Sequence, residues 1–144
     1  MDQTSLIYES ILDNISDGVL TVDLHGRIIT FNLAAARILD LACDEVLGRM
    51  FAEVFLDWEG MDAFAQTIVD AIYDASVCHQ RVVQVHTGSA LLSLALTTAY
   101  LQAPQDRTLQ KIGVIAVFSD MTEVQALREE VQALREEVQA LREA

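Results

Sequence analysis

A seven-residue repeat at the C-terminal end constrains the fold of this chain most. From Val124 the sequence reads Val-Gln-Ala-Leu-Arg-Glu-Glu, repeats from Val131, and nearly repeats again from Val138. Apolar residues at the first and fourth places of a heptad, positions a and d, form the seam of a coiled coil. Here they are Val124, Val131 and Val138 at a, and Leu127, Leu134 and Leu141 at d. The repeat predicts a helix that pairs along this seam.

The residues beside the seam favour a parallel homodimer. Valine at a with leucine at d is typical of two parallel strands, in which Glu130 at g faces Arg135 at e of the partner helix. A solvated single helix is the weaker alternative, because it leaves the seam in water. Three heptads span only about 31 Å and are marginal alone, so the rest of the chain must help to dimerise. Such identity is unusual for a natural coiled coil, which varies its outward positions b, c and f, so it favours later heptads that were engineered or chosen to extend a native one. The sequence does not decide whether they are native.

Composition indicates one folded domain with an appendage. The 144 residues are 52% hydrophobic and 22% charged, as in globular proteins. A net charge of -13 with Lys111 as the single lysine argues against nucleic acid as a partner. The start of the chain lacks a signal-peptide pattern and no apolar run reaches about 18 residues, so we expect a cytoplasmic protein without a membrane partner. Cys43 and Cys78 lie in no metal or redox spacing and are expected to be buried, unbridged thiols.

The chain before the repeat divides into a short helix and a mixed core. Leu6, Ile7 and Ile11 fall on one face of a helix that we expect near the N-terminus, where they would contribute to the dimer. Three segments are predicted: a dimerisation helix over 1–16, a core over 17–119 and a coiled-coil helix over 120–144.

Five apolar runs predict strands, at Val19–Asp23, Arg27–Phe31, Gln80–His86, Ala90–Leu101 and Lys111–Phe118. Gly26 suits the tight turn between the first two, and a loop is expected over Gln102–Arg107 around Pro104. Asn32 stands where a helix N-cap belongs, and Met61–Ser76 has the longest helical pattern of the core. Two strands, several helices and three strands in a meander describe an α+β domain with one antiparallel sheet.

Both faces of the last strands are apolar. Leu94 and Leu96 share one face of their strand, while Ala95 and Ala99 lie on the other. An antiparallel sheet with a solvated face would alternate with polar residues. We therefore expect the second face to be covered, in part by another copy of the chain.

Several short strings, in their order and spacing, resemble the PAS family of sensor domains. They are Ile15-Ser16-Asp17-Gly18-Val19, Asp23-x-x-Gly26, Phe31-Asn32-x-Ala34-Ala35, Leu47-Gly48 followed by Phe51, and Asp120-Met121-Thr122. The last is similar to the Asp-x-Thr signature that joins a PAS core to its output helix. The resemblance covers about Gln3 to Glu123. It implies a five-stranded antiparallel sheet with helices on one face, a cavity between them, and dimerisation through the N-terminal helix and the outer sheet face.

The junction between core and coil is expected at Asp120, Thr122 and Glu123. Asp120 as N-cap with Glu123 three residues later forms a capping box, so the output helix would begin firmly at the end of the last strand.

No string in the sequence would assemble a catalytic site, a phosphate-binding loop or a nucleophile elbow, so we expect no enzyme activity. The region Gly48-Arg49-Met50-Phe51 lacks the cysteine that flavin-binding relatives of PAS domains carry. No cofactor is expected. Haem with His79 as axial ligand, or a small apolar ligand in the cavity, stay open as alternatives.

Two functions follow from these features. The first is a dimeric relay that passes a conformational change through the coiled coil to an effector such as a histidine kinase or nucleotide cyclase. The second is a sensor that binds a ligand or haem. The sequence identifies neither the effector nor the input signal.

Overall fold

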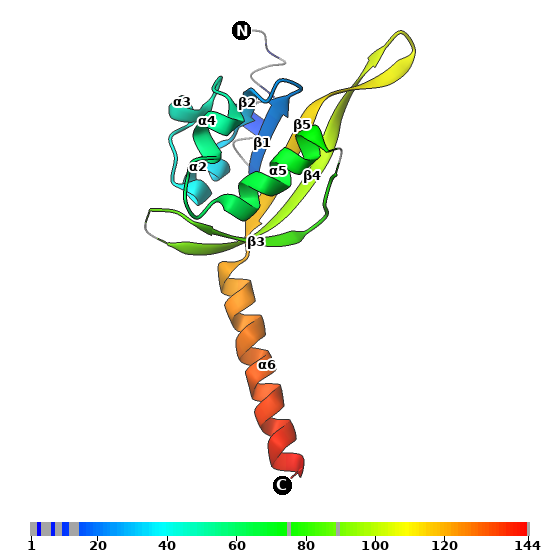
Figure 1. Ribbon diagram of the computed structural model, residues 1–144. Helices are drawn as coiled ribbons and strands as arrows, with labels where there is room; N and C mark the ends of the chain where they lie inside the picture. Colours follow the sequence, from blue (N-terminus) through cyan, green and yellow to red (C-terminus); the bar gives the residue numbers. More distant parts are fainter. Residues whose placement is uncertain are drawn as a thin grey trace.

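A five-stranded antiparallel sheet forms the centre of the protein (Figure 1). The computed structural model describes residues 3, 7, 10, 11, 15–74, 76–88 and 90–143, without the side chain of residue 105. The strands, in the spatial order β2-β1-β5-β4-β3, are β1 (Gly18–Asp23), β2 (Ile28–Phe31), β3 (Arg81–His86), β4 (Leu91–Gln105) and β5 (Thr108–Asp120). The predicted α+β class and the meander of the last three strands are confirmed.

Four helices cover one face of the sheet, and a fifth leaves the domain from the end of β5 (Figure 1). They are α2 (Leu33–Leu39), α3 (Cys43–Val46), α4 (Phe51–Phe55), α5 (Asp62–Tyr73) and α6 (Thr122–Glu143). α5 packs across β3, β4 and β5. It ends three residues earlier than the predicted helix.

Asn32 joins the first helix to the first strand. Its side-chain oxygen accepts hydrogen bonds from the backbone N–H of Ala35 and of Val19, both at 2.9 Å, and its amide donates to the carbonyl of Asp17. The predicted N-cap is therefore confirmed, and it also holds α2 against β1. Gly26 adopts a φ of 87° in the β1–β2 turn, as the tight turn requires.

The loop predicted over Gln102–Arg107 is wrong. β4 and β5 stay paired as far as Gln105 and Thr108, so a two-residue turn at Asp106 and Arg107 closes a long ribbon that projects from the domain (Figure 1). Both turn residues have positive φ, 51° and 69°, which matches the twist of a hairpin. Pro104 is tolerated because the ribbon has no further strand beside it.

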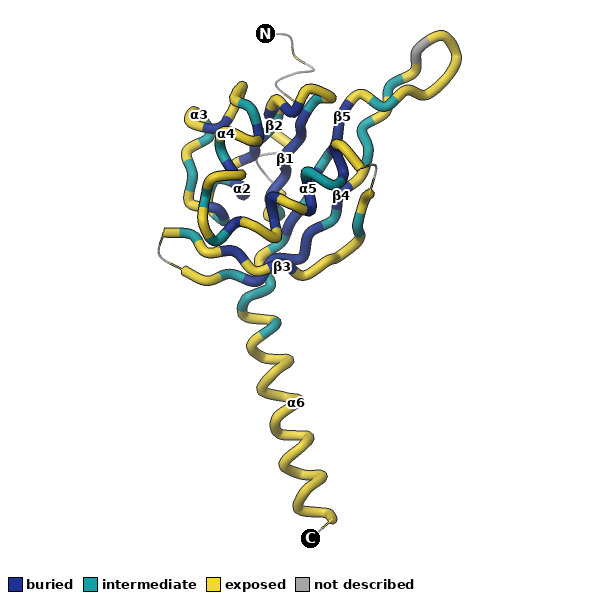
Figure 2. The backbone as a smooth tube through the Cα atoms, in the orientation of Figure 1, coloured by how far each residue is buried: buried dark blue, intermediate teal, exposed yellow. Residues whose placement is uncertain are grey.

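The core lies between the sheet and the helices, and α6 takes no part in it (Figure 2). The largest fully buried side chains include Phe55, Phe64 and Phe118. The thiols of Cys43 and Cys78 are unbridged and only half-buried. They donate to the carbonyls of Phe31 and Leu96 respectively. Because both thiols are only half-buried, the expectation that they are buried is wrong.

Candidate functional site

The junction between sheet and output helix is fixed by hydrogen bonds to β4. The backbone N–H of Met121 donates to the carbonyl of Ser93 at 2.7 Å. In return, the N–H of Ser93 donates to Thr122 Oγ1 at 3.1 Å. The Thr122 hydroxyl and its backbone N–H both donate to Asp120 Oδ1. Asp120 and Thr122 thus lie together as predicted, with Ser93 as a partner that the sequence did not indicate.

The predicted capping box is wrong in its register. β5 continues through Asp120, which pairs with Leu94. The N–H of Gln125 donates to the carbonyl of Met121, so Met121, not Asp120, is the residue from which the helical hydrogen bonds begin. The Asp120 carboxylate caps the helix from one position earlier, and Glu123 lies exposed in the first turn.

The predicted seam forms an apolar stripe along α6 that none of the described residues covers. α6 has no buried residue, and it stands away from the domain in Figure 2. The exposed fractions are 40% for Val124, 60% for Leu127, 45% for Val131, 53% for Leu134, 47% for Val138 and 72% for Leu141. An open hollow of about 440 Å³ runs along this stripe between Val124 and Arg135. Three seam residues, Val124, Leu127 and Val131, line it together with the polar side chains of Arg128, Gln132 and Arg135.

The N-terminal residues of the predicted interface are only partly within the described residues. Ile7 and Ile11 are helical and about half exposed, at 51% and 52%. Leu6 lies outside the described residues. A dimer contact of this segment stays a prediction.

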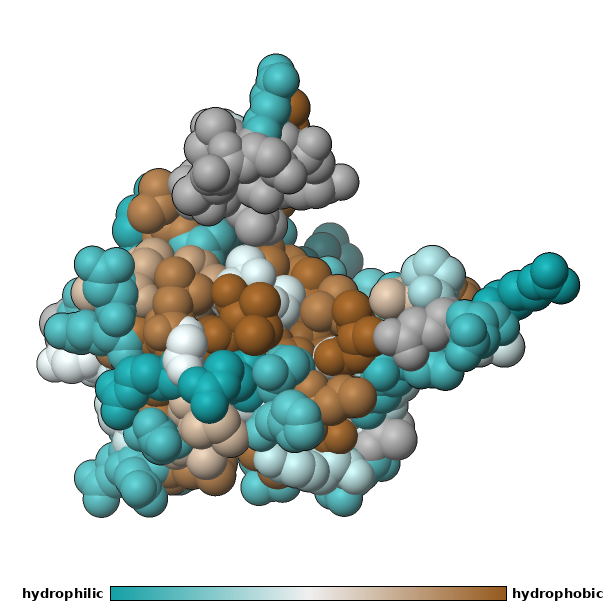
Figure 3. Space-filling model, turned by 90° about the horizontal axis from the view of Figure 1, so that it is seen from above, coloured by the Kyte–Doolittle hydropathy of each residue, from teal (hydrophilic) through white to brown (hydrophobic). Residues whose placement is uncertain are grey.

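The outer sheet face is as apolar as the sequence indicated. Val19 and Val117 stand opposite each other, and Ile115 pairs with Thr21 on one side and Ala99 on the other. Val19 is buried, Ile115 and Val117 are half-buried, and Ala99 is exposed. Hydrophobic side chains also gather across the end of the domain opposite α6 (Figure 3).

Among the described residues, one buried side-chain polar atom has no hydrogen-bond partner. The hydroxyl of Tyr100 is buried and makes no hydrogen bond within the described part of the chain. Lys111 Nζ lies 4.3 Å from the centroid of the Tyr100 ring, and 3.4 Å from the carbonyl oxygen of Ala71 near the C-terminal end of α5. The cation therefore interacts with both the ring and the negative end of the helix dipole.

The candidate axial haem ligand lies on the surface of the protein. His79 is exposed in the segment before β3. Among the described residues, no group of three or more His, Cys, Asp or Glu could hold a metal ion. In the same ranges no helix is long and apolar enough to cross a membrane.

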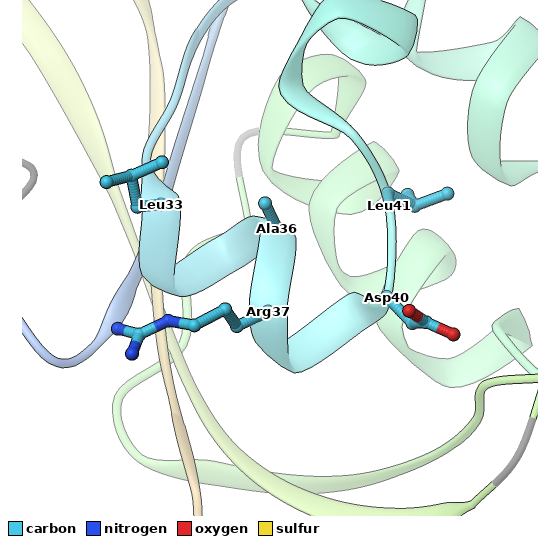
Figure 4. A pocket seen from close by; sticks show the side chains of 5 residues that line it. All are labelled: Leu33, Ala36, Arg37, Asp40 and Leu41. Carbon is cyan, nitrogen blue, oxygen red and sulfur yellow. The ribbon is translucent and has the colours of Figure 1, made fainter.

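A surface cleft of about 520 Å³ lies along α2 (Figure 4). Leu33, Ala36 and Leu41 provide apolar atoms, while the charged ends of Arg37 and Asp40 point in opposite directions. Because these charges do not converge on one point, the cleft has no polar arrangement that would orient a small ligand.

Asp23 stabilises the β1–β2 turn through its charge. The backbone N–H of Arg27, and to a smaller extent that of His25, donate to its carboxylate and lower the pKa of Asp23 below its ordinary value of 3.8. The turn holds the adjacent β1 and β2 in register at the end of the domain opposite α6.

Comparison with known proteins identifies the family. The model of the PAS fold matches residues 6–89, more than half of the chain. The chain belongs to the PAS family, whose domains are signalling sensors, so the predicted family is confirmed.

The transcriptional activator RocR of Bacillus subtilis (strain 168) is 25% identical to this chain over 123 residues. The match covers 85% of this chain and 25% of RocR, so the chain spans about a quarter of the length of that relative.

Solved structures show the same fold. The PAS domain of a protein from Colwellia psychrerythraea has a TM-score of 0.61 at 11% identity, covering 84% of this chain and 99% of that one. The PAS domain of Bordetella pertussis BvgS has a TM-score of 0.60 at 18% identity, covering 94% and 99%. An RNA-binding light-oxygen-voltage receptor has a TM-score of 0.68 at 15% identity, covering 100% of this chain and 41% of that one. At these identities the likeness concerns the fold alone.

Proposed function

We propose that this chain is a non-catalytic, cytoplasmic PAS module that relays a signal as a parallel homodimer. In this proposal, a change in the core alters the position of the two α6 helices, and an effector that follows the coiled coil responds. The observation that carries the proposal is the uncovered seam: six apolar residues, 40–72% exposed, on a helix with no buried residue. An isolated helix in water would leave all of them solvated, whereas pairing removes them from water.

Charge supports the parallel orientation. In a parallel pair Glu130 at g faces Arg135 at e of the partner, and Glu137 faces Arg142. In an antiparallel pair g faces g and e faces e, so glutamates would meet glutamates and arginines would meet arginines. Like charges at these positions oppose pairing.

The junction supports transmission. α6 begins within two residues of β5, and hydrogen bonds from Met121 and to Thr122 hold its start against Ser93 of β4. A displacement of the sheet at Ser93 would therefore be passed to the first turn of the helix. Because RocR is a transcriptional activator, control of transcription is a further candidate output besides a kinase or a cyclase.

Sedimentation of the unmodified chain and two variants tests the proposal. We expect the unmodified chain to sediment at twice its 15.9 kDa mass at micromolar concentration. Leu134→Lys buries a charge in the seam and should raise the dissociation constant at least about 100-fold, or roughly 2.7 kcal/mol. Ala133→Lys introduces the same side chain and the same charge change, +1, at the outward position c and should leave the dimer intact. A monomeric wild type, or a Leu134→Lys dimer as tight as this control, would contradict the proposal.

A ligand sensor is the second candidate, and the unpartnered Tyr100 hydroxyl favours it. A buried hydroxyl without a hydrogen bond is costly, and a small molecule with an acceptor atom would satisfy it. Native mass spectrometry of the purified protein tests this role, since a bound molecule would add its mass to the chain. A visible absorption band would indicate the haem alternative through His79. A colourless protein of unmodified mass would contradict both.

A further inference from the structure

Five aromatic side chains form a line of ring contacts from the helical layer to the last strand. Neighbouring ring centroids lie 4.8 Å apart for Phe51–Phe55, 6.2 Å for Phe55–Trp58, 5.7 Å for Phe55–Phe64 and 5.2 Å for Phe64–Phe118. These distances fall in the range in which aromatic pairs attract each other. We refer to these residues as the aromatic line. It contains four of the five phenylalanines and the single tryptophan of the chain.

Phe118 ends this line beside the output junction. It is fully buried in β5, its ring meets Phe64 edge to face at 89°, and its backbone pairs with Gly18. A Cβ atom on Gly18 would lie 2.3 Å from Phe118 Cε2, so the ring occupies the space that a side chain would fill. Asp120, which caps α6, follows two residues later. The ring is thus held between β1 and α5 immediately before the output helix.

We propose that Phe118 is a positioning residue that couples the pairing of α6 to the helical layer through the aromatic line. This inference rests on the proposed dimeric relay and names the contact that it would use. Close packing favours such coupling, because a ring with neighbours on both sides cannot shift alone. Pairing of α6 fixes the end of β5, Phe118 follows the strand, and Phe64, Phe55 and Trp58 move with it. The coupling is reciprocal, so a change at the helices alters pairing by the same free energy.

Trp58 provides a direct readout, because it lies half-buried at the helical end of the line and is the one tryptophan of the chain. Its emission spectrum is compared between the dimer and the Leu134→Lys variant, whose α6 is unpaired. We expect the two spectra to differ in wavelength or in accessibility to a quencher. In a Phe118→Leu background the same comparison should give less than half of that difference.

Phe31→Leu is the matched control. Phe31 is buried as well, at 4% exposed, but no ring contact joins it to the aromatic line among the described residues. The spectral difference should therefore persist in its background. Phe64→Leu interrupts the line one contact further from α6 and should act as Phe118→Leu does, which covers the case that one variant fails to fold.

The outcomes separate this inference from the proposed function. A dimer by sedimentation whose Trp58 spectrum is unchanged by Leu134→Lys would overturn the inference alone. A spectral difference that survives both Phe118→Leu and Phe64→Leu would also overturn it, since Trp58 would then respond without the line. A monomeric wild type would overturn the inference together with the proposed function.

Discussion

Replacing Gly18 with alanine tests the packing beside the junction. The added Cβ would lie 2.3, 2.5 and 2.8 Å from three carbon atoms of the Phe118 ring. Carbon atoms pack at about 3.5–4.0 Å, so the ring or the strand must move by roughly 1 Å. The ring has little room to move, because it is fully buried and contacts Phe64 at 5.2 Å on its other side.

The expected loss follows from two opposing effects. Forcing an extra carbon into a close-packed core costs about 1–3 kcal/mol. Alanine lowers the conformational entropy of the unfolded chain relative to glycine, which stabilises the fold by about 0.4–1 kcal/mol. We therefore expect Gly18→Ala to lower the free energy of unfolding by about 1–2 kcal/mol. In a Phe118→Leu background the penalty should fall by at least about 0.5 kcal/mol, because contacting residues are coupled.

Urea denaturation followed by circular dichroism, at one fixed protein concentration, measures this loss. Gly88→Ala is the matched control, since a Cβ there meets no atom within 4 Å and its φ is not positive. The control should stay within about 0.5 kcal/mol of the wild type. If Gly18→Ala is equally harmless, Phe118 does not occupy the position described.

Three further changes test the junction, the first helix and the β1–β2 turn. Thr122→Ala leaves the Ser93 N–H without its acceptor and should cost about 1–2 kcal/mol and speed hydrogen exchange in the first turn of α6, whereas Thr122→Ser should not. Asn32→Ala removes the acceptor of two buried N–H groups and should cost about 2–4 kcal/mol in urea denaturation; a loss below about 1 kcal/mol would refute this. The lowered pKa of Asp23 favours its charged form in the fold, so its stabilisation is present above pH 3.8 and lost as the pH falls through the lowered pKa. The advantage of the wild type over Asp23→Asn should therefore shrink in acid, and an advantage that is constant with pH would contradict the assigned hydrogen bonds.

Much of the fold could be predicted because local patterns and tertiary packing agree. Asn32 precedes a run of helix-forming residues and does cap α2. Gly26 lies in the turn between two apolar runs and has the positive φ expected there. In each case the residue type has one strong local preference, and the fold uses it.

The remaining features depend on contacts between distant residues. Asp106 suits the first position of a two-residue hairpin turn, but Arg107 stands where glycine is usual, and Pro104 suggests a loop, so the local signal for the long ribbon was weak. Ser93 meets Thr122 across 29 positions, which only the strand register determines. The capping box failed because β5 extends through Asp120, whose pairing with Leu94 takes precedence over the local cap. No pattern in the sequence predicts that the ring of Phe118 packs over Gly18.

The parallel pairing of α6 is the central claim, and a cross-link at the distal end of the seam tests it most directly. Leu141→Cys places a thiol at position d, where two parallel helices in register bring equivalent Cα atoms within reach of a disulfide, below about 7 Å. Antiparallel helices would separate these positions by roughly 25 Å along the axis. Glu136→Cys, at the outward position f, is the control. We predict rapid oxidation to a dimer linked between the two introduced thiols for Leu141→Cys and little for Glu136→Cys, with mass mapping to distinguish Cys43 and Cys78. Equal cross-linking of both variants, or none at Leu141→Cys, would contradict the parallel coiled coil.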